Sequence, residues 1–143
     1  MKLAFLLFFT FTTLWATSSL KDKALTLLPS PLNQFEMHKT TLSEIETKLG
    51  KANLVEGNHY YWEREGMKYA VKLTFNNKFV LDTLHYTFQS EKPGIDKLGK
   101  IDTKKLEPYI SSGKPTKYMV LKDKELEVVI DPVFKKVYSV KVP

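Results

Sequence analysis

The sequence lacks cysteine altogether, and arginine occurs once, as Arg64. Without cysteine there is no disulfide and no site for a lipoprotein anchor, so a folded domain has to be stabilised by packing alone. A single arginine provides no arginine-rich patch of the kind that binds nucleic acid, and we therefore expect no nucleic-acid partner.

The residue patterns that carry most enzyme chemistry are also missing. There is no G-x-S-x-G sequence and no glycine-rich phosphate-binding loop, and the three histidines, His38, His59 and His85, lie in separate segments. A nucleophilic triad or a metal site needs its groups gathered at one place. We therefore expect a protein that is not an enzyme, with no catalytic residue, no metal and no cofactor.

One arrangement of the histidines stays open. His59 and His85 would approach each other if their strands were neighbours, and Glu63 or Asp82 could then complete a metal site. The simpler interpretation is that these histidines are solvated or packed. Asp82 also interrupts an otherwise apolar strand, where it would face solvent or cap a hairpin.

The N-terminus has the pattern of a secretory signal peptide. Lys2 is followed by an uncharged run over residues 3–15 and then by the small residues Ala16, Thr17 and Ser18. A basic start, an apolar middle of this length and small residues before the cut are typical of an export signal. We expect cleavage after Ser18, or after Ala16, which leaves a periplasmic or secreted protein that is not a lipoprotein.

A retained membrane anchor is the alternative to cleavage. Threonines interrupt the apolar run, which reaches only about residue 20 and so falls near the lower limit of the roughly 20 residues that span a bilayer. No other stretch is long enough, so we expect no membrane span after cleavage. The absence of cysteine and of Asn-x-Ser/Thr glycosylation sequences favours a bacterial envelope as the destination.

The folded part carries a positive net charge. The whole chain has a formal charge of +6 at pH 7, and removal of Lys2 leaves about +5. Lysines are spread along the chain, with only short clusters such as residues 104–105 and 135–136. A solvated basic surface is one interpretation, and attraction to an acidic partner or an anionic membrane face is the other.

A short helix and an irregular segment are expected at the start of the folded part. Apolar residues recur at helical spacing between residues 19 and 28. Pro29 and Pro31 end this helix, because proline cannot donate the backbone hydrogen bond that continues it. Residues 32–39 then show no regular pattern.

The second helix has clear start and stop signals. Thr41 and Glu44 have the spacing of a capping box, and residues 42–49 carry one apolar face. Gly50 follows at the position where a helix often ends in a left-handed residue. A helix of two turns is not stable alone, so it has to pack on another element.

Three antiparallel strands are predicted after this helix. Residues 59–63 are aromatic and strand-like, residues 68–75 alternate between apolar and polar side chains, and residues 79–88 form the third strand. Turns at residues 65–66 and 76–77 separate them. The first unit is therefore a helix followed by three strands.

The same order of elements is predicted in the second half. Leu106 and Ile110 would share the apolar face of a short helix, although Pro108 lies inside it and would bend it or delay its start. The strands of this half are expected at residues 117–122, 125–130 and 134–142.

Matching halves indicate a tandem duplication. Residues 73–76 align with residues 128–131, and residues 81–84 align with residues 137–140. The identity is weak, and chance similarity of two ordinary segments is the alternative. The expected fold is α+β: two tandem α-β-β-β repeats, with short helices packed on one face of an antiparallel sheet.

The expected boundaries follow from these patterns. Residues 1–18 form the signal peptide and residues 19–37 an N-terminal segment. The first α-β-β-β repeat covers residues 38–90. The second covers residues 91–143 and forms one compact domain with the first.

Several short motifs resemble a group of exported binding proteins. Residues 40–52, the pair Tyr61 and Trp62, and residues 70–77 look like the SmpA/BamE-like and beta-lactamase-inhibitor-like (BLIP-like) group. This resemblance implies an envelope or secreted binding module that is not an enzyme. It also implies that tandem copies present a concave sheet face to a protein partner.

The sequence departs from the pattern of that group at one position, and its second half also resembles another group. Ala52 stands where the group usually has proline after its helix, while Pro115 keeps the proline in the second half. Residues 126–131 and 135–140 also resemble the closing hairpin of PepSY domains, an exported group linked to peptidase inhibition. No inhibitory residue of either group is carried over by position.

An aromatic strand is the best candidate for a binding surface. His59, Tyr60, Tyr61 and Trp62 place rings on both faces of one strand. One face has to pack on the helix, and the other is free for a partner unless the N-terminal segment covers it. Tyrosine and tryptophan dominate binding hot spots because they are large and rigid. The residues that could extend this face are Tyr86, Phe88, Tyr118 and Tyr138.

These patterns together predict a non-catalytic protein- or peptide-binding module of the bacterial envelope, acting as an inhibitor or an assembly factor. The alternative is a small-ligand or lipid-binding periplasmic protein, which a deep apolar cavity between helices and sheet would favour. An envelope hydrolase is a third class, which would need His59, His85 and a carboxylate around one pocket.

Overall fold

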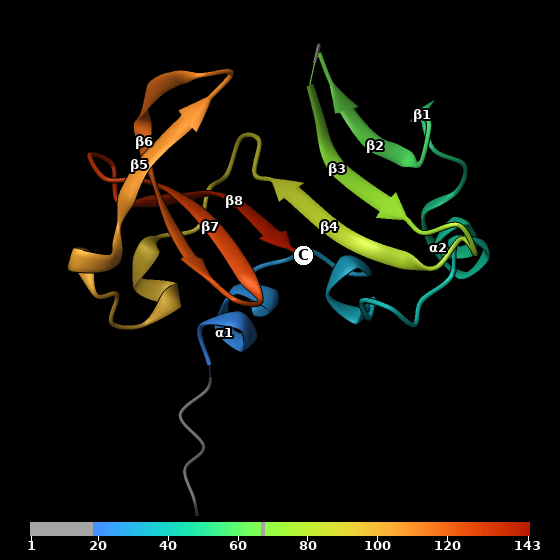
Figure 1. The fold of residues 1–143 in the computed structure, drawn as a ribbon, viewed down its shortest axis with the longest axis horizontal. Helices are drawn as coiled ribbons and strands as arrows, with labels where there is room; N and C mark the ends of the chain where they lie inside the picture. Colours follow the sequence, from blue (N-terminus) through green and yellow to red (C-terminus); the bar gives the residue numbers. More distant parts are fainter. Residues whose placement is uncertain (1–18, 67) are drawn as a thin grey trace, which may run out of the picture.

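A single antiparallel sheet dominates the computed structural model, which describes residues 19–66 and 68–143 (Figure 1). The predicted signal peptide lies outside the described residues. The strands, in sheet order, are β1 (Leu54–Glu56), β2 (His59–Glu65), β3 (Lys68–Phe75), β4 (Leu81–Thr87), β8 (Lys136–Val142), β7 (Leu126–Asp131), β6 (Lys114–Asp123) and β5 (Glu107–Ser111). The predicted α+β class with an antiparallel sheet is confirmed.

Short helices accompany the sheet. The two α-helices are α1 (Leu20–Thr26) and α2 (Leu42–Leu49), and single 3-10 turns form η1 (Leu32–Gln34), η2 (Ile95–Leu98) and η3 (Thr103–Lys105). Figure 1 shows α1 and α2 beneath the sheet, on the same side of it. No helix among the described residues combines the length and the apolar character needed to cross a membrane.

Two four-stranded meanders make up the sheet. Strands β1 to β4 run in sequence order from one edge, β5 to β8 run in sequence order from the other, and the last strands of the two meanders, β4 and β8, pair at the centre. Central pairing of the two closing strands joins both halves of the chain in one sheet.

Local signals place the two α-helices as predicted. The Thr41 hydroxyl accepts from the Glu44 amide at 3.3 Å, and the Glu44 carboxylate accepts from the Thr41 amide at 2.8 Å, so the capping box is formed. Ser19 caps α1 through the amide of Asp22 at 3.1 Å. Side-chain capping satisfies donors that a short helix otherwise leaves unpaired.

Apolar residues of the helices and of both meanders form one core. Ala24 of α1 and Ile45 of α2 are fully buried, as are Leu73 of β3, Leu84 of β4 and Val140 of β8. These strand residues share the sheet face that the helices cover: Leu73 lies directly opposite Leu84, and Leu84 and Val140 keep the same face across the β4–β8 pair. The opposite face of the sheet is therefore the one that the helices leave uncovered.

The second half differs from the prediction at its start. The helix expected around Leu106 and Ile110 is wrong: η3 ends at Lys105, and Glu107–Ser111 is strand β5. Pro108 accounts for the difference, since proline interrupts a helix but is tolerated on an edge strand, where its missing N–H is not needed for the ladder. Each half has four strands rather than three: β1 precedes the aromatic strand β2 in the first half, and β5 replaces the expected helix in the second.

The sheet is strongly curved. Figure 1 shows β2 and β3 rising on one side of the central strands and β5 and β6 rising on the other, away from the helices. Irregular pairing occurs between residues 74 and 75 and between residues 129 and 130. Such bulges bend a strand and increase its twist. The uncovered face of the sheet is therefore concave, and we call it the concave face.

Candidate functional site: the concave sheet face

A row of polar side chains crosses the floor of the concave face. Residues directly opposite each other in neighbouring strands share a face, so the register of the sheet defines the row. From β2 to β6 it consists of Tyr61, Lys72, His85, Lys141, Glu127 and Lys122. We call these six residues the transverse row. Three lysines and one glutamate make it basic.

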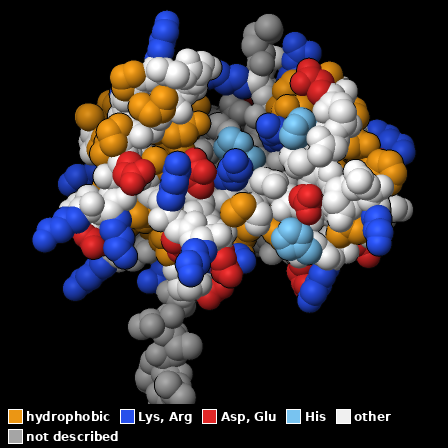
Figure 2. Space-filling model, viewed as in Figure 1, with side chains coloured by type: hydrophobic (Ala, Val, Ile, Leu, Met, Phe, Trp, Pro, Cys, Tyr) orange, Lys and Arg blue, Asp and Glu red, His pale blue; other side chains and the backbone are white. Residues whose placement is uncertain are grey.

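A hollow lies over the β2–β4 part of this row. Its volume is about 340 Å³, and it is lined by residues of four strands: Tyr61, Lys68, Tyr69, Ala70, Lys72, His85, Thr87 and Tyr138. Figure 2 shows the surface dipping between the two raised arms of the sheet. The presence of Tyr138 of β8 beside residues of β2 and β3 means that both meanders contribute to this hollow.

Tyrosine rings stand on both sides of the hollow in fixed pairs. Tyr118 and Tyr138 stack with centroids 4.4 Å apart, and Tyr61 lies 5.4 Å from Tyr69. Contact with a neighbouring ring restricts each side chain before any partner arrives. Rings fixed in this way offer large contact area at low entropic cost.

Cations accompany these rings. The Lys72 Nζ lies 5.9 Å from the centroid of Tyr61, and the Lys117 Nζ lies 5.4 Å from that of Tyr118. Both distances are within the range of a cation–π interaction. The Arg64 guanidinium lies over Tyr69 at 5.9 Å, and its Nε donates to the Gly66 carbonyl. The concave face therefore combines aromatic surface with positive charge.

His85 occupies the centre of the transverse row between two lysines. Burial, together with the charges of Lys141 and Lys72, lowers the pKa of its imidazole to about 4. All three effects disfavour the protonated ring. His85 is therefore neutral at pH 7, and the positive charge of the row comes from its lysines.

The structure divides the five predicted binding residues between the two faces. Tyr61 and His59 lie on the concave face, where the His59 Nδ1 is 2.9 Å from the Thr74 hydroxyl. Trp62 is 3% exposed, and its indole N–H donates to the carbonyl of Gly50 at 3.0 Å, next to the end of α2. Its ring is therefore part of the packing under the sheet.

The other two predicted residues accompany Trp62 on the helix side. Tyr60 stacks on Trp62 and meets Phe75 edge to face at 5.1 Å. Tyr86 contacts the buried ring of Phe88 at 4.9 Å and packs against the core. Of the residues expected to extend the aromatic face, Tyr118 and Tyr138 do lie on the concave side, opposite the face that the helices cover.

Sequence reasoning missed the lysines of the row and Tyr109. The pKa of Tyr109 is raised by burial and by the nearby charges of Glu127 and Tyr138, which places its ring by the same face. Lys72 and Lys141 carry a signal in the sequence, since each occupies a polar position between apolar residues of a strand. Only the pairing of β4 with β8 brings these two lysines to either side of His85.

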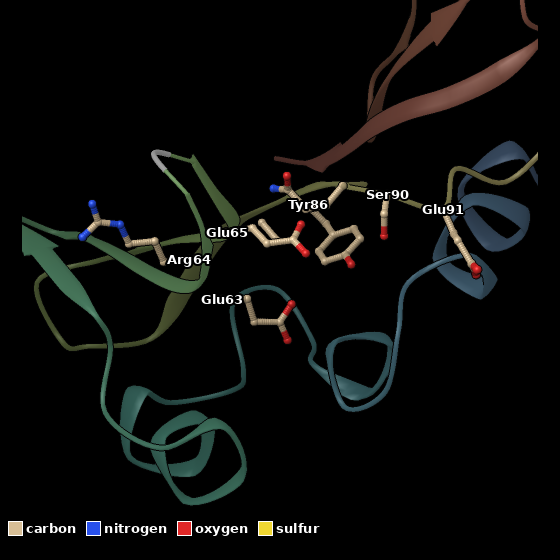
Figure 3. A pocket seen from close by; sticks show the side chains of 8 residues that line it. Glu63, Arg64, Glu65, Tyr86, Ser90 and Glu91 are labelled. Carbon is tan, nitrogen blue, oxygen red and sulfur yellow. The ribbon is translucent and has the colours of Figure 1, made fainter.

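A second hollow has an acidic lining. It lies where β2 ends and β3 begins, beside the segment after β4, and Glu63, Glu65 and Glu91 line it with Tyr86. Figure 3 shows the side chains of Glu63 and Glu65 directed towards the Tyr86 ring, while Arg64 extends away. Burial raises the pKa of the Tyr86 hydroxyl, and the charges of Glu63 and Glu65 raise it further.

The residues considered for a metal site are not gathered together. In the sheet His59 lies opposite Thr74, whereas His85 lies opposite Lys72. Asp82 instead approaches His38, with 3.3 Å between its carboxylate and Nδ1. Within residues 19–66 and 68–143, no three histidine or carboxylate side chains form a group that could hold a metal ion.

Comparison with known proteins finds no relative. No family model matches the chain, and neither a curated protein nor a solved structure matches it. Function has to be argued from the concave face itself.

Proposed function

We propose that this chain is a non-catalytic binding module that holds a protein or peptide partner on its concave face. The observation that carries the proposal is the aromatic lining of that face. The stacked pair Tyr118 and Tyr138 belongs to the second meander, and the pair Tyr61 and Tyr69 belongs to the first. Tyrosine is enriched in protein interfaces, and here ordered tyrosines surround a hollow.

Packing beneath the sheet argues against small-ligand or lipid carriage. The space between the helices and the sheet is filled by fully buried side chains, among them Ile45, Val71 and Leu73. A lipid carrier needs an apolar cavity at that place. The hollow on the concave face is lined by lysine, histidine and tyrosine instead, which suits a polar polypeptide surface better than an acyl chain.

The strand order supports an internal duplication of the chain, which the resemblance to the BLIP-like and SmpA/BamE-like group also implies. Two meanders that meet through their last strands are what two copies of one unit would give. We propose that the repeated unit is a four-stranded meander, preceded in the first copy by α2 and in the second by η3. In this proposal both copies contribute to a single concave surface, as the resemblance implies for a partner-binding sheet.

We further propose that the module works in a bacterial envelope after export. The basic, apolar and small-residue order of residues 1–18 supports this location. Expression of the full chain in a bacterium, followed by N-terminal sequencing of the periplasmic fraction, tests it. The expected new N-terminus is Ser19 or Thr17, and an intact Met1 on a cytoplasmic protein would refute the location.

Selection from a displayed random-peptide library tests the binding function directly. The purified protein is immobilised, and three proteins are compared: wild type, Tyr118→Ser with Tyr138→Ser, and Phe79→Ser. Phe79 is 57% exposed in the β3–β4 turn, so it is an aromatic control away from the concave face.

We expect peptides enriched on the wild type to bind the Phe79→Ser protein equally and to lose roughly tenfold in affinity on the double variant. Equal binding to all three proteins would place the binding surface elsewhere. The far-UV circular dichroism of each protein checks that the double variant is folded.

A further inference from the structure

The transverse row has more positive charge than its own side chains neutralise. Of the four ion pairs formed by the described residues, none involves Lys72 or Lys141. The one carboxylate in the row, Glu127, lies across from Lys141 and Lys122 in the register, beyond the distance of an ion pair. The two lysines beside His85 are therefore available to a charge from outside.

Further cations surround the same hollow. Lys68 lines it directly, and the Arg64 guanidinium and the Lys117 ammonium lie over two of the tyrosine rings at its sides. Glu63 and Glu65, the carboxylates next to Arg64 in the chain, line the separate hollow shown in Figure 3.

On the concave face itself, Glu127 lies in the transverse row and Glu56 lies opposite His59, where its charge acts on Tyr61. The residues that line the hollow include Lys68 and Lys72 and no carboxylate, so the hollow itself is basic.

The depression of the His85 pKa agrees with this geometry. Burial is its largest cause, and the positive charges of Lys141 and Lys72 add to it. These two charges disfavour a further positive charge on the floor and attract a negative one.

We propose that the partner of the concave face is an acidic segment of a protein, which places Asp or Glu side chains over Lys72 and Lys141 and apolar or aromatic side chains against the flanking tyrosines. This inference rests on the proposed function and names the chemistry of its partner. Charge complementarity of this kind steers association and selects the partner.

An anionic membrane is the other source of negative charge for such a surface. The geometry favours a polypeptide, because the lysines lie on the floor of a concave surface between two raised arms (Figure 1). A flat bilayer would meet the rims of the arms first, whereas a protruding segment of a protein can reach the floor. Vesicles therefore belong in the test as a competing ligand.

Three fluorescein-labelled peptides of equal length are the probes: alternating Glu-Tyr, Gln-Tyr and Lys-Tyr. Fluorescence anisotropy measures their binding to wild type, to Lys72→Gln with Lys141→Gln, and to the control Lys97→Gln with Lys104→Gln. Lys97 and Lys104 are exposed on η2 and η3, and their substitution lowers the net charge by the same amount as substitution of Lys72 and Lys141. Vesicles of phosphatidylglycerol and phosphatidylcholine are tested on the same proteins by sedimentation.

The expected result is tightest binding of the Glu-Tyr peptide, a loss of about tenfold on the Lys72/Lys141 variant and little change on the control. Added salt should weaken the Glu-Tyr complex most. Thermal unfolding of each variant confirms that it is folded under the binding conditions.

Three results would overturn the proposal. Equal binding of the Glu-Tyr and Gln-Tyr peptides would refute the acidic partner and leave the binding function standing. An equal loss on both double variants, or vesicle binding that depends on Lys72 and Lys141, would refute it as well. Failure of all three peptides, together with failure of the library selection described above, would refute the binding function itself.

Discussion

His85 is the residue whose chemistry the concave face changes most. Its ring lies between two lysines on the neighbouring strands, with Glu127 one strand further along the row. Burial and both lysine charges disfavour protonation. The imidazole therefore reports on the electrostatics of the concave face.

Proton NMR of the His85 ring should give a pKa of about 4, well below the ordinary value of 6.5. Lys72→Gln and Lys141→Gln should each raise this pKa, because each removes a positive charge that opposes protonation. Lys97→Gln should leave it unchanged. A His85 pKa near 6.5 in the wild type would contradict the assigned burial and charge environment.

The same shift links stability to pH. Because the folded-state pKa of His85 is lowered, the unfolded chain binds the proton first, and the free energy of unfolding falls as the pH drops from about 6.5 to about 4. We expect this contribution to be at most about 3 kcal/mol. Urea denaturation across this pH range measures it, and His85→Gln should flatten the dependence; an unchanged slope would refute the assignment.

Trp62 is expected to stabilise the fold rather than to contact a partner. Trp62→Ala removes a buried ring and should lower the free energy of unfolding by about 3–5 kcal/mol. Trp62→Phe removes the hydrogen bond to the Gly50 carbonyl and should cost about 1–2 kcal/mol. Tyr61→Ala, one residue earlier on the concave face, should cost less than about 1 kcal/mol. Urea denaturation followed by circular dichroism compares them; equal losses for residues 61 and 62 would contradict the assignment of faces.

At the level of elements, local sequence signals decided where the structure could be predicted. The capping box at Thr41, the stop at Gly50 and the alternation over residues 68–75 act within one or two turns of chain, and the corresponding elements form where expected. The helix expected at residues 106–110 failed because its apolar spacing suits an edge strand equally well, and Pro108 excludes only the helix.

The capping box itself gives a test at this scale. Thr41→Ala should lower the free energy of unfolding by about 1 kcal/mol, since it leaves a donor at the start of α2 without its partner. Ser43→Ala is the matched control, because Ser43 is an exposed residue of the same helix. Urea denaturation measures both, and equal effects would show that the hydroxyl of Thr41 does not cap the helix.

At the level of the whole molecule, pairing of β4 with β8 makes one sheet and one core from two meanders. This long-range pairing also creates the site, since it brings Lys141 beside His85 and Tyr138 beside the hollow of the first meander. No local pattern encodes it. For this reason the sequence predicts the aromatic residues as a group. It does not predict their division between the two faces of the sheet, nor the transverse row.

The shared core predicts that the two meanders unfold together. Leu84→Ala in β4 should lower the free energy of unfolding by about 2–5 kcal/mol. Hydrogen exchange should show reduced protection of the amides of both β3 and β7. Val55→Ala at the edge, where the side chain is 49% exposed, is the control. Loss of protection confined to β2 and β3 would indicate that the meanders are independent units.

The concave face as the binding surface is the central claim, and an NMR footprint tests it most directly. A peptide selected on the wild-type protein is added to the ¹⁵N-labelled chain, and amide shifts are followed residue by residue. The predicted result is a continuous set of shifts on β2, β3, β4 and β8 centred on His85, with α1 and α2 unaffected. Shifts centred on the helices, with the amides of Lys72, His85 and Lys141 unchanged, would contradict the claim.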